Sequence, residues 1–171
     1  MRHPFLSLAA LAALAVPAAA QLNVRFSQSE NNGVCYFSVE GPGPKGGSQS
    51  FTLEFSLRVS DGNLGMDMKA NNWPKAAKAD PDKTVNVTLD TDAGKSKPSR
   101  SGGYYGGVYE RLWAGWGAGA PSAPVFDLLK RAKIVYVVAD GERHGPFDMQ
   151  IKSLPYNSLN GCAERVRKGQ R

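Results

Sequence analysis

Residues able to carry out acid–base or nucleophilic chemistry are scarce beyond residues 1–20. That part of the chain contains a single histidine, His144. A serine or cysteine nucleophile would need this histidine as its base. The histidine falls in a segment whose composition indicates a turn, so its neighbours Asp140 and Glu142 are expected to be solvated. We therefore predict no catalytic residue, and the small set of titratable groups weighs against an enzyme.

Two short motifs resemble ion-binding loops and differ from them in detail. Asp90-x-Asp92-x-Gly94 has the spacing that opens a calcium loop, but it lacks the third side-chain ligand and the closing glutamate. Gly94-Lys95-Ser96 ends like a phosphate-binding loop, yet the position that needs the first glycine is Leu89. One histidine and two cysteines add little for a transition metal. We predict neither a metal site nor a cofactor.

A segment that mixes aromatic residues with glycine, residues 103–116, is the first of two binding candidates. Exposed aromatic rings can stack on sugar rings or insert at a membrane surface. We expect Tyr109 and Trp113 to be core residues. The surface candidates in this segment are Tyr104, Tyr105 and Trp116.

The second binding candidate is basic. A polar loop contains Lys95, Lys97 and Arg100, and further cations end the chain, where they also complement a helix C-terminus. The chain has 21 Lys and Arg against 15 Asp and Glu, a net charge of +6. This excess favours an anionic partner, although solubility alone accounts for it equally well.

Alternation of apolar and polar residues predicts a sheet built from hairpins. Residues 51–59 alternate in this way, and residues 64–69 return after a turn. The same reasoning predicts seven or eight strands; besides those two they include 24–26, 34–39, 85–89, 134–138 and 147–151. Helices are expected at 125–132 and from Asn157 or Ser158 to 166. The Gly- and Pro-rich stretch 90–124 is expected to be flexible, with 114–124 as a surface linker and a weak strand near 103–113.

These elements define a fold class. We predict a mainly β protein, an antiparallel β-sandwich or strongly bent sheet with two short helices. The last helix is expected to pack on the sheet and to be linked to it by a disulfide between Cys35 and Cys162. Two buried free thiols are the alternative.

The first twenty residues have the features of a secretory signal peptide. Arg2 precedes an apolar run, and Ala18-Ala19-Ala20 suits cleavage before Gln21. Cleavage would leave one domain, residues 21–171, with no apolar stretch of membrane length. The sequence therefore predicts a periplasmic or secreted protein with no transmembrane segment in its mature form, and an exported protein is not expected to meet nucleic acid.

The C-terminal third contains Leu128 to Ala132, Ile134 to Val138, Asp140-Gly141, Phe147 to Met149, Leu159 and Cys162. This pattern resembles the closing part of exported proteobacterial β-rich proteins of the invasion-associated locus B family and related periplasmic domains of unknown function. In that family a short helix, a strand, a turn and a second strand lead to a helix with a disulfide cysteine. The upstream part lacks the tryptophan-rich opening of that family. The resemblance implies a secreted or periplasmic, non-enzymatic accessory protein and carries over no catalytic residue.

Three functional hypotheses follow. The leading one is an exported protein that binds a glycan, an anionic envelope component or a protein partner. The second is a carboxylate-based cell-wall hydrolase, which needs two carboxyl groups about 5–10 Å apart across a cleft. The third is a structural subunit of an envelope assembly, which would present an uncovered sheet edge or an apolar patch.

Overall fold

The structure, a computed structural model, describes residues 26–44, 50–107 and 109–170. The side chains of residues 26–28, 100 and 101 are not described. The expected signal peptide lies outside the described residues.

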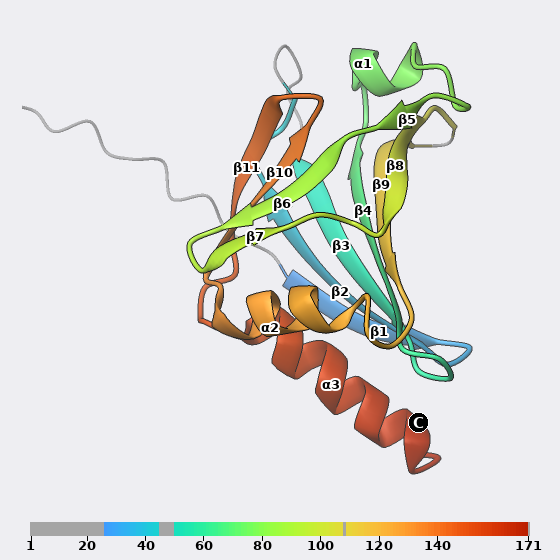
Figure 1. Cartoon of the computed structure of the whole chain (residues 1–171), viewed down its shortest axis with the longest axis vertical. Coiled ribbons are helices and arrows are strands. Elements are labelled where there is room, and N and C mark those ends of the chain that lie inside the picture. Colours follow the sequence, from blue (N-terminus) through green and yellow to red (C-terminus); the bar gives the residue numbers. More distant parts are fainter. Residues whose placement is uncertain (1–25, 45–49, 108, 171) are drawn as a thin grey trace, which may run out of the picture.

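Two antiparallel sheets form the body of the protein, which confirms the predicted fold class. The first sheet has seven strands in the order β1 (Phe26–Asn31), β2 (Val34–Gly41), β3 (Phe51–Arg58), β4 (Asn63–Ala70), β9 (Glu110–Gly117), β8 (Arg100–Tyr105) and β5 (Thr84–Val85). The second has four, in the order β11 (Glu142–Asp148), β10 (Ile134–Ala139), β6 (Val87–Thr91) and β7 (Gly94–Ser96). The four-stranded sheet crosses in front of β2 and β3 (Figure 1).

Burial alternates strictly along β2, β3 and β4, as the period-two pattern predicts. One row across the sheet joins Phe37, Phe55, Met66 and Ala114, all facing the second sheet as core residues. The two sheets meet closely where β2 ends. A Cβ on Gly41 would lie 2.5 Å from the ring of Phe147, so only glycine allows this approach.

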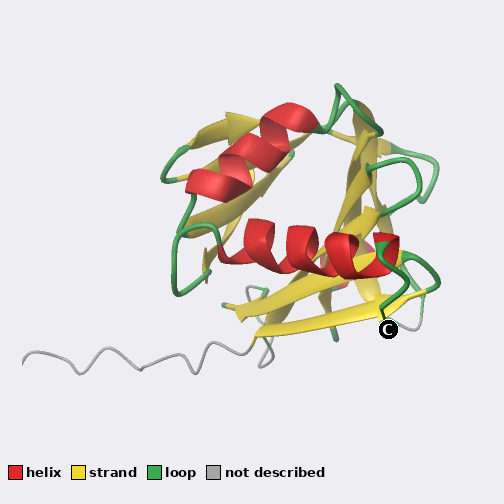
Figure 2. Cartoon of the chain, turned by 90° about the horizontal axis from the view of Figure 1, so that it is seen from below, coloured by secondary structure: helices red, strands yellow, loops and turns green. Residues whose placement is uncertain are grey.

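Three helices complete the described fold: α1 (Pro74–Ala77), α2 (Ala123–Arg131) and α3 (Leu154–Arg167). The two predicted helices are present, and the one-turn α1 was not predicted. Seen from below, α2 and α3 lie side by side across one end of the sandwich (Figure 2). α3 begins three residues before Asn157, because Ser153 adopts a left-handed conformation and Pro155 occupies the first turn, where proline is tolerated.

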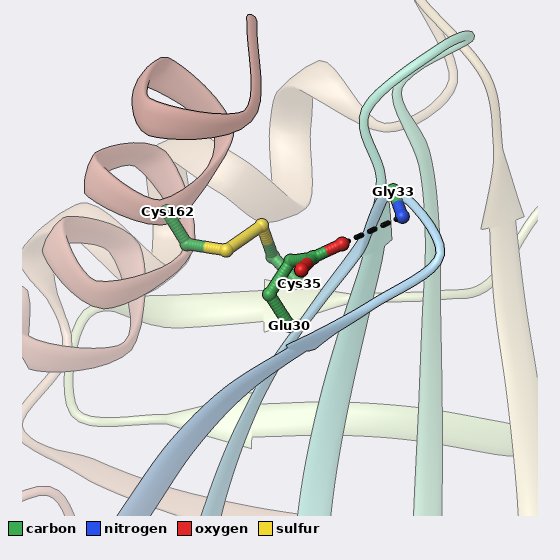
Figure 3. The surroundings of a disulfide bond; sticks show 4 residues. All are labelled: Glu30, Gly33, Cys35 and Cys162. Carbon is green, nitrogen blue, oxygen red and sulfur yellow. Dashed lines mark hydrogen bonds between the residues drawn. A yellow bond between two sulfur atoms is a disulfide. The ribbon is translucent and has the colours of Figure 1, made fainter. Parts of the chain in front are cut away.

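A disulfide between Cys35 on β2 and Cys162 on α3 attaches the last helix to the sheet (Figure 3). The two Cα atoms are 6.0 Å apart, and the half-cystines are 127 residues apart in sequence. The hairpin of β1 and β2 beside it closes through Asn32 and Gly33, both with positive φ. The predicted disulfide and the predicted packing of the last helix are confirmed.

The Gly- and Pro-rich stretch 90–124, expected to be flexible, contains the three strands β7, β8 and β9. Residues 114–117, expected in a surface linker, belong to β9, which lies between β4 and β8 inside the sheet. The glycines of this stretch predicted a loop because glycine has a low strand propensity. In the structure, glycine instead allows the backbones of neighbouring strands to come close together. A Cβ on Gly102 would lie 2.4 Å from the carbonyl oxygen of Trp113.

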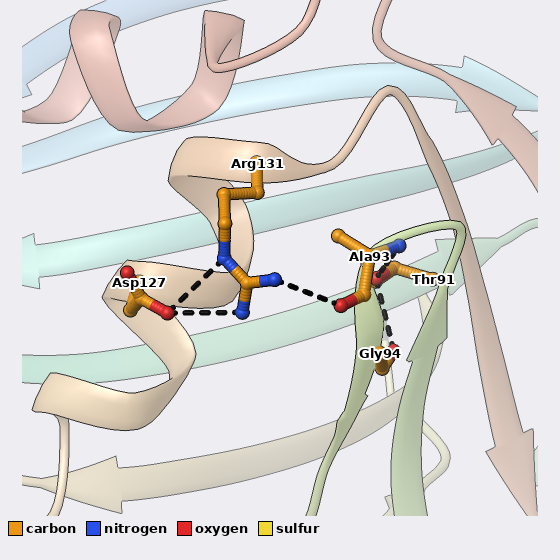
Figure 4. Close-up of polar contacts among 5 residues, drawn as sticks. All are labelled: Thr91, Ala93, Gly94, Asp127 and Arg131. Carbon is orange, nitrogen blue, oxygen red and sulfur yellow. Dashed lines mark hydrogen bonds and ion pairs between the residues drawn. The ribbon is translucent and has the colours of Figure 1, made fainter.

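The turn that resembled a calcium loop has a structural role. Lys133 and Ile134 donate their backbone N–H groups to Asp92 Oδ1 at 2.8 and 3.0 Å. Burial works against the charge of Asp92, but these hydrogen bonds outweigh it and lower the pKa. Next to it, Arg131 on α2 binds Asp127 and donates to the carbonyl of Ala93 (Figure 4). The turn thereby attaches α2 to β6.

Candidate functional site

Two of the predicted surface aromatics are buried. Tyr104 is 4% exposed and Trp116 is 1% exposed, so their assignment to the surface is wrong. Both lie on the inner face of their strands, where Trp116 shares a face with Leu112 and Ala114. The indole Nε1 of Trp116 donates to Ser96 Oγ at 3.0 Å, which satisfies its one polar group.

The aromatics expected in the core are instead exposed. Tyr109 is 56% exposed and Trp113 is 40% exposed, so the core prediction for both is wrong. Tyr105, at 45%, is exposed as predicted. Trp113 follows Leu112 in β9 and therefore points to the opposite, outer face of the sheet. The alternation of side chains from Leu112 to Trp116 is typical of a strand with Trp113 on the face opposite Leu112 and Trp116. The glycines around it favoured a loop instead.

The basic run does not join these aromatics. Lys95 lies on β7 in the other sheet, 3.7 Å from Asp90 Oδ1, and Arg143 binds the second oxygen of the same carboxylate at 3.3 Å. Lys97 is exposed in the connection from β7 to β8, and Arg100 begins β8. The cation that contacts Tyr105 is Arg111, which the sequence did not single out.

The outer face of the seven-stranded sheet gathers aromatic and charged side chains in two adjacent rows. In one row, Glu54 pairs with Asp67 and Asp67 with Trp113. In the next row, Thr52 pairs with Lys69, then Arg111, then Tyr105. Glu54, Asp67 and Lys69 occupy polar positions of the alternating runs 51–59 and 64–69, and nothing in their spacing predicts a site. We define the aromatic–ionic face as Glu54, Asp67, Lys69, Tyr105, Arg111 and Trp113.

The charges of this face are paired with one another. Lys69 Nζ lies 2.7 Å from Glu54 Oε1, and Arg111 Nη1 lies 3.9 Å from Asp67 Oδ1. The Arg111 guanidinium also lies over the ring of Tyr105, 4.8 Å from its centroid. Two carboxylates and two cations therefore give a face that is polar but close to neutral.

The environment of Asp67 is unusual for a carboxylate on a sheet surface. Burial raises its pKa, and the nearby Glu54 adds to the effect, while Arg111 and Lys69 oppose it. Asp67 Oδ1 and Arg111 Nε are both buried without a hydrogen bond in the described part of the chain. This pair therefore retains hydrogen-bonding capacity that no described residue uses.

A pocket of about 400 Å³ opens at the end of the aromatic–ionic face. It shares Lys69 with that face, and the exposed ring of Tyr109 forms part of its wall. Its size is within the usual range of small-ligand sites. The remaining lining residues are Ser50, Thr52, Ala70 and Asn71.

His144 lies in β11 and is 6% exposed, so its assignment to a solvated turn is wrong. The turn consists of Asp140 and Gly141 alone, both with positive φ, as a two-residue hairpin requires. The imidazole packs edge-on against Phe51 and Trp73, with ring centroids 5.4 and 5.5 Å apart. These contacts give it a packing role.

Neither a metal cluster nor a membrane-spanning helix is found in the described chain. No group of three or more His, Cys, Asp or Glu side chains comes together among the described residues. Within the same ranges, every helix is too short or too polar to cross a membrane.

Comparison with known proteins yields no relative. No family model matches the chain, and no significant match is found among curated proteins or solved structures. Functional inference therefore depends on the geometry of the aromatic–ionic face and its pocket.

Proposed function

We propose that this protein binds glycans through the aromatic–ionic face and the adjoining pocket. The observation that carries this proposal is the position of the exposed aromatics. Tyr105, Tyr109 and Trp113 are three of the four large hydrophobic side chains exposed in the described part of the chain, and all three come from β8, β9 or the connection between them. Tyr105 and Trp113 lie on the same face of neighbouring strands, with Tyr109 in the connection between them, and exposed rings grouped in this way suit stacking against the apolar faces of sugar rings.

The charged residues next to these rings favour a sugar ligand over an anionic envelope surface or a protein partner. Carboxylates and a guanidinium beside exposed rings can hydrogen-bond vicinal hydroxyl groups with charge-assisted strength. An anionic envelope surface would be better matched by uncompensated cations, whereas Lys69 and Arg111 are balanced by Glu54 and Asp67. A protein interface is typically depleted in charge at its centre.

We also propose that binding takes place outside the cytosol, in the periplasm or after secretion. The Cys35–Cys162 disulfide supports this, because structural disulfides persist in oxidising compartments and are rare in reducing ones. The signal-peptide pattern of residues 1–20 supports the same proposal.

The test is a glycan array followed by calorimetric titration of the best ligand. Tyr105→Ala, Tyr109→Ala and Trp113→Ala should each weaken binding by about tenfold, the equivalent of about 1.4 kcal/mol. Because all three side chains are exposed, circular dichroism should be unchanged. Ile151→Ala removes the fourth exposed large hydrophobic side chain, which lies away from this face, and is the matched control. Equal affinity in all four variants would remove this face from the function.

Hydrolysis of the bound glycan is the second candidate. It is favoured by Glu54 and Asp67, cross-strand neighbours in which one carboxyl group has a raised pKa. Both lie on one sheet face and each is paired with a cation, whereas a glycosidase usually holds its two carboxyl groups on either side of the scissile bond. If the protein is a hydrolase, Glu54→Gln and Asp67→Asn should abolish product formation from a ligand they still bind.

A further inference from the structure

A second pocket lies where the two sheets meet at the end that carries α1. Its volume is about 350 Å³, and its walls come from α1 and the turn after it, from β5 and β8, and from the β10–β11 turn. It is separate from the aromatic–ionic face, because Tyr104 lines this pocket while Tyr105, the next residue of β8, lies on the outer face. The polar lining consists of Lys75, Lys78, Asp80, Lys83, Tyr104 and Asp140.

Three lysines contribute to the walls of this pocket. Lys75 Nζ is 3.0 Å from Glu142 Oε2 on β11, an ion pair that ties α1 to the second sheet. No carboxylate lies within salt-bridge distance of Lys78 or Lys83 anywhere in the described ranges. Two ammonium groups at this pocket are therefore without a counter-ion from the described protein.

The two aspartates of the lining are engaged in backbone structure. Asp140 Oδ1 accepts the backbone N–H of Asn86 at 3.2 Å, which joins the β10–β11 turn to the start of β6. Asp80 Oδ1 accepts the backbone N–H of Asp82 at 3.0 Å and closes the turn that follows α1. Together with Glu142, the partner of Lys75, these aspartates balance the three lysines in number, but none of the three carboxylates forms an ion pair with Lys78 or Lys83.

Tyr104 adds a hydrogen-bond donor to this pocket. Its ring packs edge-on against Trp73, with centroids 5.3 Å apart, and the ammonium of Lys75 lies 5.2 Å from its centroid. Its hydroxyl group is buried, and the Lys75 ammonium is the one described group close enough to interact with its oxygen, although not with the geometry of a full hydrogen bond. Because Lys75 is a donor, the hydroxyl hydrogen of Tyr104 remains available. Burial raises the pKa of Tyr104, with Glu142 and Asp140 adding to the effect and Lys75 opposing it, so the phenol keeps its proton and can donate it to an anion.

We propose that this pocket binds a phosphate group, with Lys78 and Lys83 providing charge and the Tyr104 hydroxyl providing a directed hydrogen bond. Phosphate is preferred to carboxylate because its oxygens can meet several separate donors at once, and lysine binds phosphate as a mobile point charge. The group could belong to free phosphate or to a phosphomonoester on a lipid. The site does not depend on glycan binding.

The first probe is inorganic phosphate at low salt. Its binding is measured by calorimetry and by the NMR signals of His144 and Trp73. His144 is the only histidine beyond residues 1–20. It contacts Trp73, which in turn contacts Tyr104, so its NMR signals should shift when a ligand changes the position of Tyr104. Lys78→Gln/Lys83→Gln should weaken binding more than tenfold. Tyr104→Phe, which keeps the ring, should weaken it about tenfold. Lys97→Gln/Lys168→Gln makes the same charge change at exposed positions outside the pocket and should change affinity less than twofold.

Phosphatidylcholine vesicles with and without phosphatidic acid distinguish the two sources of phosphate. Sedimentation with phosphatidic acid that is lost in Lys78→Gln/Lys83→Gln would assign the site to a lipid head group. Binding of inorganic phosphate without sedimentation would assign it to a soluble phosphate. The proposal is overturned if neither probe binds, or if the control variant weakens binding as much as the pocket variants do.

Discussion

The indole of Trp113 packs against Gly103, its cross-strand partner on β8: a Cβ on Gly103 would stand 3.0 Å from Trp113 Nε1. The ring therefore covers the glycine and is held against the sheet, although much of it is open to solvent. A flat aromatic surface fixed in this way needs little reordering when a ligand stacks on it.

Gly103→Ala should displace the Trp113 indole and weaken glycan binding by about tenfold, because the stacking surface would no longer lie flat on the sheet. The free energy of unfolding should change by less than about 1 kcal/mol, since an exposed ring can move away. Acrylamide quenching of tryptophan fluorescence would detect the movement. Gly115→Ala is the matched control, because the nearest atom to its added Cβ, the Leu64 carbonyl oxygen, is 3.9 Å away. Identical quenching in both variants would contradict the packing described here.

Trp116→Ala should destabilise the protein far more than Trp113→Ala. Removing a fully buried indole leaves a cavity and an unpaired Ser96 hydroxyl group, at a cost of about 3–5 kcal/mol. Trp113→Ala removes a half-exposed ring and should cost about 1 kcal/mol. Urea unfolding followed by far-UV circular dichroism compares the two. Equal losses would show that β9 does not face the core as the structure has it.

Loss of the Cys35–Cys162 disulfide should lower the free energy of unfolding by about 5 kcal/mol. The bond closes a loop of 127 residues, and the chain-entropy model assigns this amount to a loop of that length. Cys35→Ala/Cys162→Ala and the reduced wild-type chain should lose comparable stability in urea unfolding. The variant itself should not respond to reductant. A reductant-insensitive wild type would argue against the bond.

The stability of the wild-type chain should fall below about pH 6.5 because of His144. Burial lowers its pKa, with Lys75 adding to the effect and Glu142 opposing it. The unfolded chain then takes up a proton near pH 6.5 that the folded chain still excludes, so stability is lost as pH decreases.

His144→Phe keeps the contacts with Phe51 and Trp73 and should remove this dependence. Between about pH 7.5 and about pH 5, the free energy of unfolding should decrease more in the wild type than in the variant, because only the wild type has the shifted imidazole. Asp67 and every other shifted group are present in both chains, so their effects cancel in the comparison. Parallel pH profiles would mean that the imidazole titrates normally.

Much of the sheet could be predicted from local pattern. Alternation along residues 51–59 and 64–69 identified β3 and β4, and the Asp140-Gly141 dipeptide identified the turn between β10 and β11. The disulfide was predictable because the chain has only two cysteines. These signals are local or depend on composition, so they need no knowledge of how the sheets pack.

The candidate site was predicted only in part. Tyr105 was correctly placed on the surface, but Tyr104 and Trp116 were expected there and are buried, while Tyr109 and Trp113 were expected in the core and are exposed. The glycines in this segment kept β8 and β9 from being predicted. Glycine occurs both in loops and where strands approach closely, and the sequence alone does not distinguish the two.

By itself, the sequence determined that successive side chains in each strand point to opposite sides, that tight turns join several strands, and that one sulfur pair was available for a bond. Only the tertiary structure decided which side of β8 and β9 is covered by the second sheet. A period of two separates neighbours such as Tyr104 and Tyr105, but it carries no information about which of the two faces the core. That choice is made by the apolar surface across the sandwich, which belongs to distant parts of the chain.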